Sequence, residues 1–251
     1  MTETIDVAAG GYRYIPGVFQ YSAGVGALDG FQIERVTLHT PLPLAEGFSF
    51  IERYLTDRGV PLRAFCACEL RSPAPFTEAG FIAFNRHYCG TLERWGVMTG
   101  EENPVARSNV CPEIDKPAEP SFHAFCFARQ VPGASGSFVI AGSGEAEEGH
   151  ASYRERTVRF GDTSPAGLRE KGIFVLSRME QRMAALGATW SDTTASQVYT
   201  VFDLHPFLRD EIVRRGAARG GLTWHLARPP VLGLDYEMDC RRVPVERRVW
   251  P

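Results

Sequence analysis

Apolar residues recur every three or four positions along several stretches of the chain, which is the spacing of amphipathic helices. From Leu44 to Leu55 the intervals are four, three and four residues, which predicts a helix over residues 43–58 that ends at Gly59. Further helices are expected over about residues 78–95, 165–186 and 206–215.

Short apolar or alternating runs, bounded by glycine, proline and polar residues, predict strands between these helices. They lie at residues 19–26, 62–70, 121–128, 137–144, 196–202, 222–227 and 234–240, and one more starts at Arg107. The run at 137–144 repeats the strand and glycine bend of 19–26, and the same order of elements follows it, which indicates an internal repeat. The sequence therefore predicts an α+β fold with two similar halves, each a mixed sheet with helices packed on one face.

Length and charge narrow the classes of function. A chain of 251 residues, of which 44% are hydrophobic, can bury two cores. Its formal net charge of -3 gives no general attraction to nucleic acid or to an anionic membrane, so neither is expected as a partner. No run of about 18 apolar residues occurs and the first residues do not resemble a signal peptide, so a soluble, cytoplasmic protein is expected. Residues 145–163 are too polar for a core and are expected to form a mobile flap.

Neither the cysteines nor the histidines are spaced as metal ligands usually are. The six cysteines include no Cys-x-x-Cys pair, and Cys66 and Cys68 face the same side of a predicted strand, where thiols pack as small apolar groups. The six histidines are scattered, and the His-x-Glu with Pro-Cys-x-x-Cys pattern of zinc deaminases is absent. A metal-activated water has no support in this pattern, and we expect neither a metal nor an organic cofactor.

The candidate chemistry lies in the first half. A predicted helix carries Asn85 and Tyr88 in an Asn-x-x-Tyr pattern, and a Pro-x-Ala-Arg-Ser motif that contains Arg107 leads into the next strand. By itself such an arginine is more often part of a surface salt bridge, but its planar guanidinium can also bind a carboxylate through two parallel hydrogen bonds. Together the two motifs resemble the RidA/YjgF family, the small trimeric enamine and imine deaminases.

The resemblance implies two tandem RidA-like domains of the chorismate-mutase-like fold. It covers about residues 12–129 and 137–242, so the domains are assigned to residues 1–130 and 137–251. In that family the arginine holds the substrate carboxylate, the asparagine lies nearby, and three domains close into a ring with sites at the seams. A homo-oligomer, preferably a trimer of the tandem chain, is therefore expected to bind a small carboxylate substrate.

The two halves differ where the family's chemistry would lie. The family's last strand ends in Val-Glu-Ile-Glu-Ala, and its second glutamate faces the pocket. The second half keeps an acid there at Glu237, whereas the first half has Phe125 in that place. Conversely, the arginine motif has no clear copy in the second half, where Ala227-Arg228 is the nearest approach. We therefore predict that Arg107 and Glu237, although they come from different halves, line one pocket.

Hydrolysis of an enamine through its imine requires an aimed water, a proton for nitrogen and a clamp on the neighbouring carboxylate. The resemblance assigns the clamp to Arg107 and the proton transfers to Glu237. A glutamate among aromatic residues could have the raised pKa that proton transfer near neutral pH requires. Glu237 could instead be a structural ion-pair partner of Arg241 or Arg228. The candidate substrate-binding residues are Asn85, Arg228, Tyr199 and Tyr21.

A tandem chain suggests a larger substrate than the usual small imino acids. A dicarboxylate such as 2-aminomuconate, from aromatic degradation, would fit if Arg228 or Arg86 held the far carboxylate. Two alternatives stay open. Chorismatases also pair two RidA-like domains and use a glutamate on the last strand to protonate chorismate before pyruvate leaves, and a non-catalytic RidA-like protein would only bind a metabolite.

Overall fold

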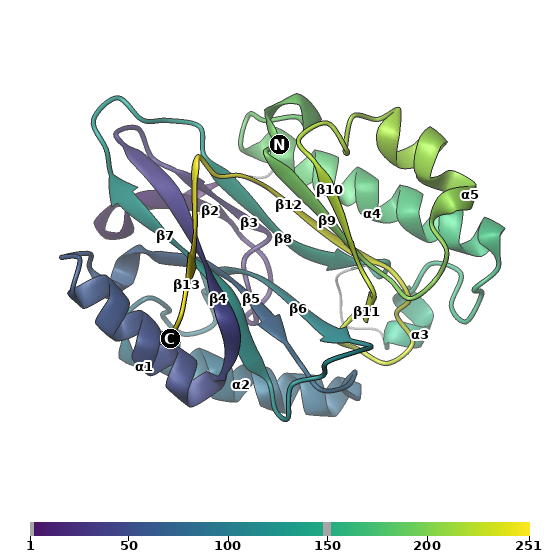
Figure 1. The fold of residues 1–251 in the computed structure, drawn as a ribbon, viewed down its shortest axis with the longest axis horizontal. Coiled ribbons are helices and arrows are strands. Elements are labelled where there is room, and N and C mark those ends of the chain that lie inside the picture. The colour runs from purple at the N-terminus through teal and green to yellow at the C-terminus, as the bar shows by residue number, and fades with distance from the viewer. Residues whose placement is uncertain (1–2, 148–151) are drawn as a thin grey trace.

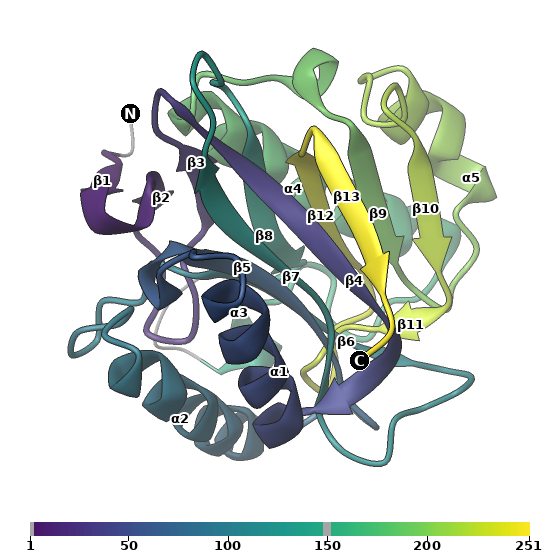
Figure 2. The ribbon, with the colours of Figure 1, turned by 60° about the vertical axis from the view of Figure 1, so that its left-hand side comes forward.

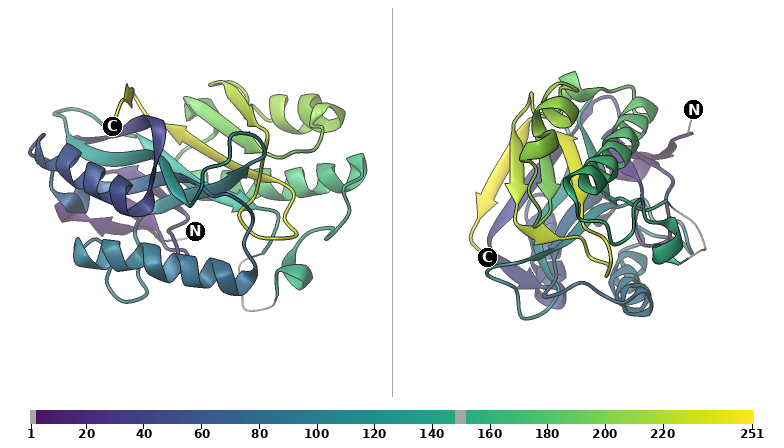
Figure 3. Two further views of the ribbon diagram at one scale, coloured as in Figure 1. Left: turned by 60° about the horizontal axis from the view of Figure 1, so that its bottom comes forward. Right: turned by 90° about the vertical axis from the view of Figure 1, so that its right-hand side faces the viewer.

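Two mixed β-sheets face each other in the computed structural model, which describes residues 3–147 and 152–251. The first sheet has the strand order β11-β6-β5-β7-β4-β13, and the second has the order β1-β2-β3-β8-β12-β9-β10. Helices α1 and α2 cover one sheet and α4 and α5 the other, so the described chain has helices outside and strands inside (Figure 1). In both views of Figure 3, helices α1 and α2, drawn in blue, lie apart from α4 and α5, drawn in green.

The first sheet consists of β4 (Phe31–Pro43), β5 (Phe65–Arg71), β6 (Ala106–Pro112), β7 (Ser121–Gln130), β11 (Ala227–Arg228) and β13 (Val245–Val249). The second consists of β1 (Ile5–Val7), β2 (Tyr12–Ile15), β3 (Gly24–Ala27), β8 (Phe138–Gly144), β9 (Ala195–Tyr199), β10 (Leu222–His225) and β12 (Glu237–Arg242). The helices are α1 (Leu44–Thr56), α2 (Glu78–Arg94), α3 (Tyr153–Arg156), α4 (Pro165–Ala185) and α5 (His205–Phe207), which continues as a π-helical turn over Leu208–Val213.

The two longest helices begin where their sequences predict a start. The Thr77 side chain accepts a hydrogen bond from the Gly80 N–H at the start of α2, and Ser164 accepts one from Gly167 at the start of α4. Such caps satisfy N–H groups that have no partner inside the helix. The helices predicted over residues 43–58, 78–95 and 165–186 are confirmed.

The same topology occurs in both halves. In the first half, β4 pairs antiparallel with β7, β7 antiparallel with β5, and β5 parallel with β6. In the second half, β8 pairs antiparallel with β12, β12 antiparallel with β9, and β9 parallel with β10. The predicted α+β class, with helices on one face of each mixed sheet, is confirmed.

The predicted match between residues 19–26 and 137–144 is wrong. Strand β3, which overlaps the end of the former run, pairs directly with β8, whereas the topological counterpart of β8 is the long strand β4. Strand β4 escaped notice because Glu34 and Arg35 interrupt its apolar pattern, yet both are buried. Arg35 forms an ion pair with Glu69 at 2.7 Å, which makes a charged residue tolerable inside the sheet.

At each end of the chain, strands pair with the sheet of the other half. Strands β1, β2 and β3 extend the sheet of the second half, and β13 pairs parallel with β4 of the first half. Figure 2 shows β13 alongside β4 and β3 alongside β8. Each sheet therefore contains strands from both ends of the chain.

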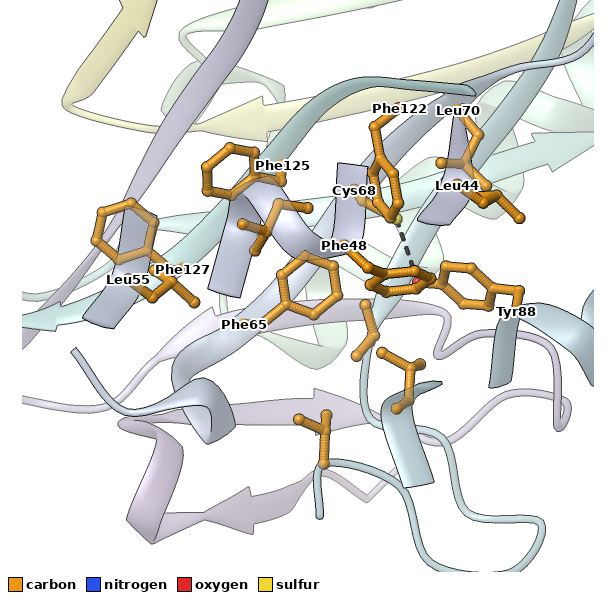
Figure 4. Close-up of a cluster of buried hydrophobic side chains, with 14 of the residues drawn as sticks. Leu44, Phe48, Leu55, Phe65, Cys68, Leu70, Tyr88, Phe122, Phe125 and Phe127 are labelled. Atoms are coloured by element: carbon orange, nitrogen blue, oxygen red, sulfur yellow. Dashed lines mark hydrogen bonds between the residues drawn. The ribbon is translucent and has the colours of Figure 1, made fainter. Parts of the chain in front are cut away.

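An aromatic core fills the space between the first sheet and its helices. Phe48 of α1 contacts Phe122 of β7 edge to face at 4.8 Å, and the Tyr88 hydroxyl of α2 lies 3.2 Å from the Cys68 sulfur (Figure 4). A second core lies between the other sheet and α4. Small and aromatic residues, among them Tyr12, Ala67 and Ala141, form a third cluster between the two sheets. This close approach of the sheets brings residues of both halves into one site.

Residues 145–163, the predicted flap, are only partly described. Residues 148–151 of that prediction lie outside the described residues. The described remainder includes α3, whose Tyr153 N–H donates to Glu78 at the start of α2 at 3.0 Å. Among the described helices, none is both long and apolar enough to cross a membrane.

Candidate active site

Arg107 lies near the start of β6, with its side chain turned toward α2. Only 3% of its surface is exposed. One guanidinium nitrogen, Nη2, donates to the Asn85 side-chain oxygen, while Nη1 is buried without a hydrogen-bond partner among the described residues. The Tyr88 and Tyr21 ring centres lie 4.7 and 5.5 Å from the guanidinium carbon. This cation is therefore held by an amide and by aromatic faces, and one of its donors remains available for a ligand.

Asn85 holds Arg107 in place. It is fully buried on α2, and its side-chain N–H donates to the Phe81 carbonyl at 2.7 Å. That hydrogen bond leaves the amide oxygen directed at Arg107, because an amide has one end that donates and one that accepts. Asn85 thus lies behind the arginine rather than among the residues that line the pocket.

Glu237 is the first residue of β12 and is 4% exposed. Burial raises the pKa of its carboxyl well above the ordinary value, and the nearby Asp239 and Glu145 carboxylates raise it further, whereas Arg107 acts in the opposite direction. Neither suggested ion-pair partner reaches it, because Arg241 binds Glu246 at 2.7 Å and Arg228 binds Glu113 at 3.1 Å. Glu237 is therefore a buried, readily protonated acid.

A glycine makes room for this acid. A β-carbon on Gly142 of β8 would lie 2.2 Å from Glu237 Oε1 and 3.2 Å from the Ser108 α-carbon. The first contact would force the Glu237 carboxyl to move and the second would be tight, so glycine at this position lets the three strands approach with the carboxyl where it lies. The backbone beside Arg107 and the Glu237 carboxyl are thus brought together across Gly142.

A buried ion cluster fixes the turn that leads into Glu237. The Glu145 carboxylate accepts hydrogen bonds from the Asp235 and Tyr236 N–H groups at 2.6 and 3.0 Å. Lys171 of α4, itself fully buried, lies 3.5 Å from Glu145 and also binds Asp235. These contacts position the start of β12 against β8 and α4, which sets the direction of the Glu237 side chain.

Asp239 lies two residues beyond Glu237, on the same side of β12. It accepts hydrogen bonds from Ser108 at 2.5 Å and from Gln197 and Tyr199 at 2.9 Å each. Ser108 follows Arg107 on β6, so its hydrogen bond to Asp239 connects β6 and β12, the strands that carry the two candidate catalytic groups. Asp239 was not singled out in the sequence.

The structure brings Arg107, Glu237 and Tyr21 to one pocket of about 570 Å³, including its open mouth. The prediction that Arg107 and Glu237 line a single pocket is therefore confirmed, and both residues come from one chain. The roles assigned to them stay predictions. The pocket also contains residues that the sequence analysis missed, namely Tyr153, Arg156 and Arg182.

Three other candidates lie elsewhere. The Arg228 side chain is 42% exposed and paired with Glu113, and Arg86 is bound to exposed Glu101 and lies over the Phe19 ring. Tyr199 is buried between the sheets, bonded to Asp239. None of these three is among the described residues that line the pocket. Arg228 and Arg86 were candidates for a second cation but do not line the pocket, whereas Arg156 and Arg182 do.

Across residues 3–147 and 152–251, no three His, Cys, Asp or Glu side chains cluster as metal ligands would. The expectation of cofactor independence stays a prediction. All six cysteines are buried free thiols. Burial raises the pKa of Cys68, whose sulfur contacts the Tyr88 hydroxyl, to about 12, so it is not a nucleophilic thiolate near neutral pH.

Comparison with known proteins decides the family. Residues 4–247 match the family model described as 2-aminomuconate deaminase CnbZ. The chain belongs to this family. It is also 51% identical over 243 residues to the 2-amino-5-chloromuconate deaminase of Comamonas testosteroni, an alignment that covers 96% of this chain and 97% of that relative. Membership of the family confirms the predicted deaminase class.

Proposed function

We propose that the chain converts 2-aminomuconate, or a ring-cleavage product closely related to it, into the corresponding 2-oxo dicarboxylate and ammonia by hydrolysis. The observation that supports this most is the single pocket that contains an arginine suited to a carboxylate and a buried carboxyl group, Glu237, whose pKa is raised by burial. The family and the relative's substrate name point to the same class of compound. The proposed substrate is both an enamine and a dicarboxylate.

Arg107 binds the carboxylate next to the amino-bearing carbon. Its Nη1 and the remaining N–H of Nη2 are the donors for that contact, and Asn85 prevents the guanidinium from rotating. The buried surroundings strengthen this contact relative to water, because few other dipoles compete for the charge. Binding thus fixes the reacting carbon beside Glu237.

Glu237 then moves protons in both steps. In its protonated form it donates to a carbon of the conjugated chain, so the enamine becomes an iminium ion and Glu237 a carboxylate. The carboxylate next accepts a proton from a water that attacks the iminium carbon, which gives a neutral aminoalcohol. Glu237 then gives this proton to the amino nitrogen, the carbon–nitrogen bond breaks to release ammonia, and the hydroxyl proton returns to Glu237 as the carbonyl forms. A raised pKa serves both steps, since the acid must be protonated at the start and basic enough to activate water afterwards.

The fold proposal follows the repeated topology. Two RidA-like units, with residues 1–130 and 137–251 as their boundaries, are supported by the identical strand order of the halves. The crossing of β1, β2, β3 and β13 modifies those boundaries at both ends.

We propose a trimer of the chain as the assembly. Sedimentation at micromolar concentration should give three times the chain mass, and a monomer would contradict this.

The function is tested by incubating the purified protein with 2-aminomuconate and, separately, with chorismate. We expect ammonia to be released from the first and no pyruvate from the second. Pyruvate from chorismate without ammonia from 2-aminomuconate would replace the proposal with the chorismatase-like alternative. Release of neither product, with both compounds bound, would favour a protein that only binds a metabolite.

A further inference from the structure

Asn109, two residues beyond Arg107 on β6, lines the same pocket and has a hydrogen-bond donor that the fold does not use. Only 3% of its surface is exposed. Its side-chain oxygen accepts a hydrogen bond from the Ser72 hydroxyl at 2.9 Å, whereas its Nδ2 has no hydrogen-bond partner among the described residues. A buried amide N–H without a partner destabilises a folded protein and is therefore rare. The pocket thus contains a donor that is suited to an acceptor on a ligand.

Ser72 holds this amide in its orientation. It is fully buried directly after β5, and its backbone N–H donates to the Val110 carbonyl on β6 at 2.9 Å. The Ser72 hydroxyl is thus anchored to the strand that carries Asn109. Because this hydroxyl donates to Oδ1, the N–H groups of Nδ2 are left for another acceptor. Ser72 itself is not among the described residues that line the pocket.

The positions of Arg107 and Asn109 suit the two ends of one extended ligand. Residues i and i+2 of a strand project from the same face and are about 7 Å apart. A β-carbon on Gly142 would contact both the Glu237 carboxyl and the α-carbon of Ser108, the residue between Arg107 and Asn109. The Glu237 carboxyl therefore lies beside the middle of this span. A six-carbon diene with an oxygen-bearing group at each end has a comparable length.

Apolar side chains line the pocket together with these polar groups. Phe81 of α2, Val231 and Leu234 are all buried and belong to one hydrophobic cluster. Such a wall packs against a hydrocarbon chain, while a few polar groups fix the orientation of the ligand. A ligand with oxygen atoms at both ends and an unsaturated chain between them matches this part of the lining.

We propose that Asn109 donates through Nδ2 to an oxygen at the end of the substrate opposite the carboxylate that Arg107 binds. The proposal rests on the proposed function and adds a specificity-determining residue to it. In 2-aminomuconate that oxygen belongs to the C6 carboxylate. Contacts at both ends position the conjugated chain beside Glu237, so that the acid meets one defined carbon.

The test uses two stable ligands, trans,trans-muconate and sorbate, which differ only in a carboxylate or a methyl group at C6. Isothermal titration calorimetry gives the Kd of each ligand for the wild type and for N109L, which nearly keeps the side-chain volume and removes the donor. The wild type should bind muconate more tightly than sorbate. N109L should bind muconate about 10- to 100-fold more weakly than the wild type, and sorbate less than about 3-fold more weakly.

Ser72→Ala tests the orientation of the amide without removing its donor. S72A should bind muconate about 3- to 10-fold more weakly than the wild type and sorbate within about 2-fold, because the Asn109 amide can then rotate. Ser121 provides the matched control. It is also buried, but its hydroxyl donates to the Glu119 carbonyl, and neither residue is among the described lining of the pocket. S121A should leave both Kd values unchanged.

Three results would overturn the assignment. An equal loss of affinity for both ligands in N109L would place the Asn109 contact at the carboxylate that they share. An unchanged ratio of the two Kd values in N109L and S72A would show that Asn109 makes no contact at C6. A wild type that binds muconate no more tightly than sorbate would exclude a contact there altogether. Circular dichroism establishes that each variant is folded, and if N109L is not, the ratio in S72A decides.

Failure of the two proposals can be told apart. If the wild-type protein releases ammonia from 2-aminomuconate but N109L keeps the wild-type ratio of Kd values, only the role of Asn109 is wrong. If the ratio changes as expected but the wild-type protein releases no ammonia, the proposed function itself is wrong and Asn109 remains a ligand-binding residue.

Discussion

Comparing the two halves residue by residue shows how the site is divided between them. Glu237 pairs with the last residue of β8 and the last residue of β9, and Ser121 of the first half pairs in the same way with the last residues of β4 and β5. By this register the counterpart of Glu237 is Ser121, not Phe125 as the sequence suggested. The error arose because the strand's start could not be located from its apolar pattern.

The same register identifies the counterpart of Arg107. In the first half, Arg71 of β5 pairs with Val110 of β6, and Cys68, three residues earlier, pairs with Arg107. In the second half, Tyr199 of β9 pairs with His225 of β10, and Ser196, three residues earlier, pairs with Leu222. Since Tyr199 and Arg71 occupy equivalent strand ends, Leu222 occupies the position of Arg107. The first half thus has an arginine and a serine where the second has a leucine and a glutamate. Each half supplies one of the two groups, and neither contains both.

The largest effect is expected from Glu237→Gln, which keeps the shape of the side chain but removes the carboxyl proton that Glu237 is proposed to transfer. We expect kcat to fall by about 100- to 10,000-fold, with KM much less affected. The matched change at the counterpart, Ser121→Ala, should leave kcat within about 3-fold of wild type, because Ser121 is not among the described pocket residues. Steady-state ammonia release measures both, and equal losses in the two variants would break the proposed division of roles.

The same variant should be more stable than the wild type at alkaline pH. Because the pKa of Glu237 is raised in the folded state, ionisation of this buried carboxyl costs stability as the pH rises above its ordinary value of 4.5 toward the folded pKa. Glutamine has no such cost. The melting temperature of E237Q should therefore exceed that of wild type at pH 8, and the difference should shrink as the pH approaches 4.5.

The next largest effect is expected from Arg107→Ala. Loss of the charge-assisted contact with the substrate carboxylate should cost about 2 to 4 kcal/mol of transition-state stabilisation. This corresponds to a kcat/KM that is roughly 30- to 1,000-fold lower, mainly through KM. The counterpart change, Leu222→Met, should leave kcat/KM nearly unchanged. The double variant R107A/E237Q should lose less than the sum of the single losses, since both residues act on one transition state. Strict additivity would argue for two independent sites.

A smaller, pH-dependent effect is expected from Asp239→Asn. Its carboxylate raises the pKa of Glu237, so removing the charge should lower that pKa. The limb of the kcat profile in which activity falls with rising pH, as the acid loses its proton, should move to lower pH. By register the counterpart of Asp239 is Ala124, because the pairing of β7 with β5 skips His123. H123Q, at this skipped residue outside the described lining of the pocket, provides the control whose pH profile should match the wild type.

The smallest effect is expected from metal removal. Arg107, Glu237 and a water together supply every step of the proposed reaction, so dialysis against a chelator should leave kcat/KM within about 2-fold. Restoration of lost activity by added zinc would contradict the mechanism and would require a metal to activate the water.

The sequence predicted the helices and the two catalytic candidates better than it predicted the strands. Helices with a buried stripe, such as α1 and α4, have a pattern that needs no knowledge of neighbours. Strand β13, Val245–Val249, has three charged residues in a row, and it is stabilised by ion pairs such as Glu246 with Arg241 and Arg35. Arg35 lies 211 residues away in sequence, so local patterns could not identify the strand.

One arginine of the pocket lining, Arg182, was missed for a related reason. Arg182 borders the buried stripe of α4, and an arginine there is usually in solvent. Arg228 seemed the better candidate because it precedes the acidic strand, but Glu113, more distant in sequence, pairs with it. Arg107 was found because its motif combines a turn, a strand start and a helix with Asn85, which is more information than a single charged residue provides.

The crossing of the termini has a consequence for how the protein is made. The first sheet lacks its edge strand β13 until residues 245–249 have been synthesised, on the order of 100 residues after β7, or about 5 to 20 s of translation. Until then the outer edge of β4 is an unpaired strand, which is prone to pair with other chains. Complete pairing of β4 in a nascent chain therefore waits for β13, and a cut between residues 130 and 137 would separate these two paired strands onto different fragments.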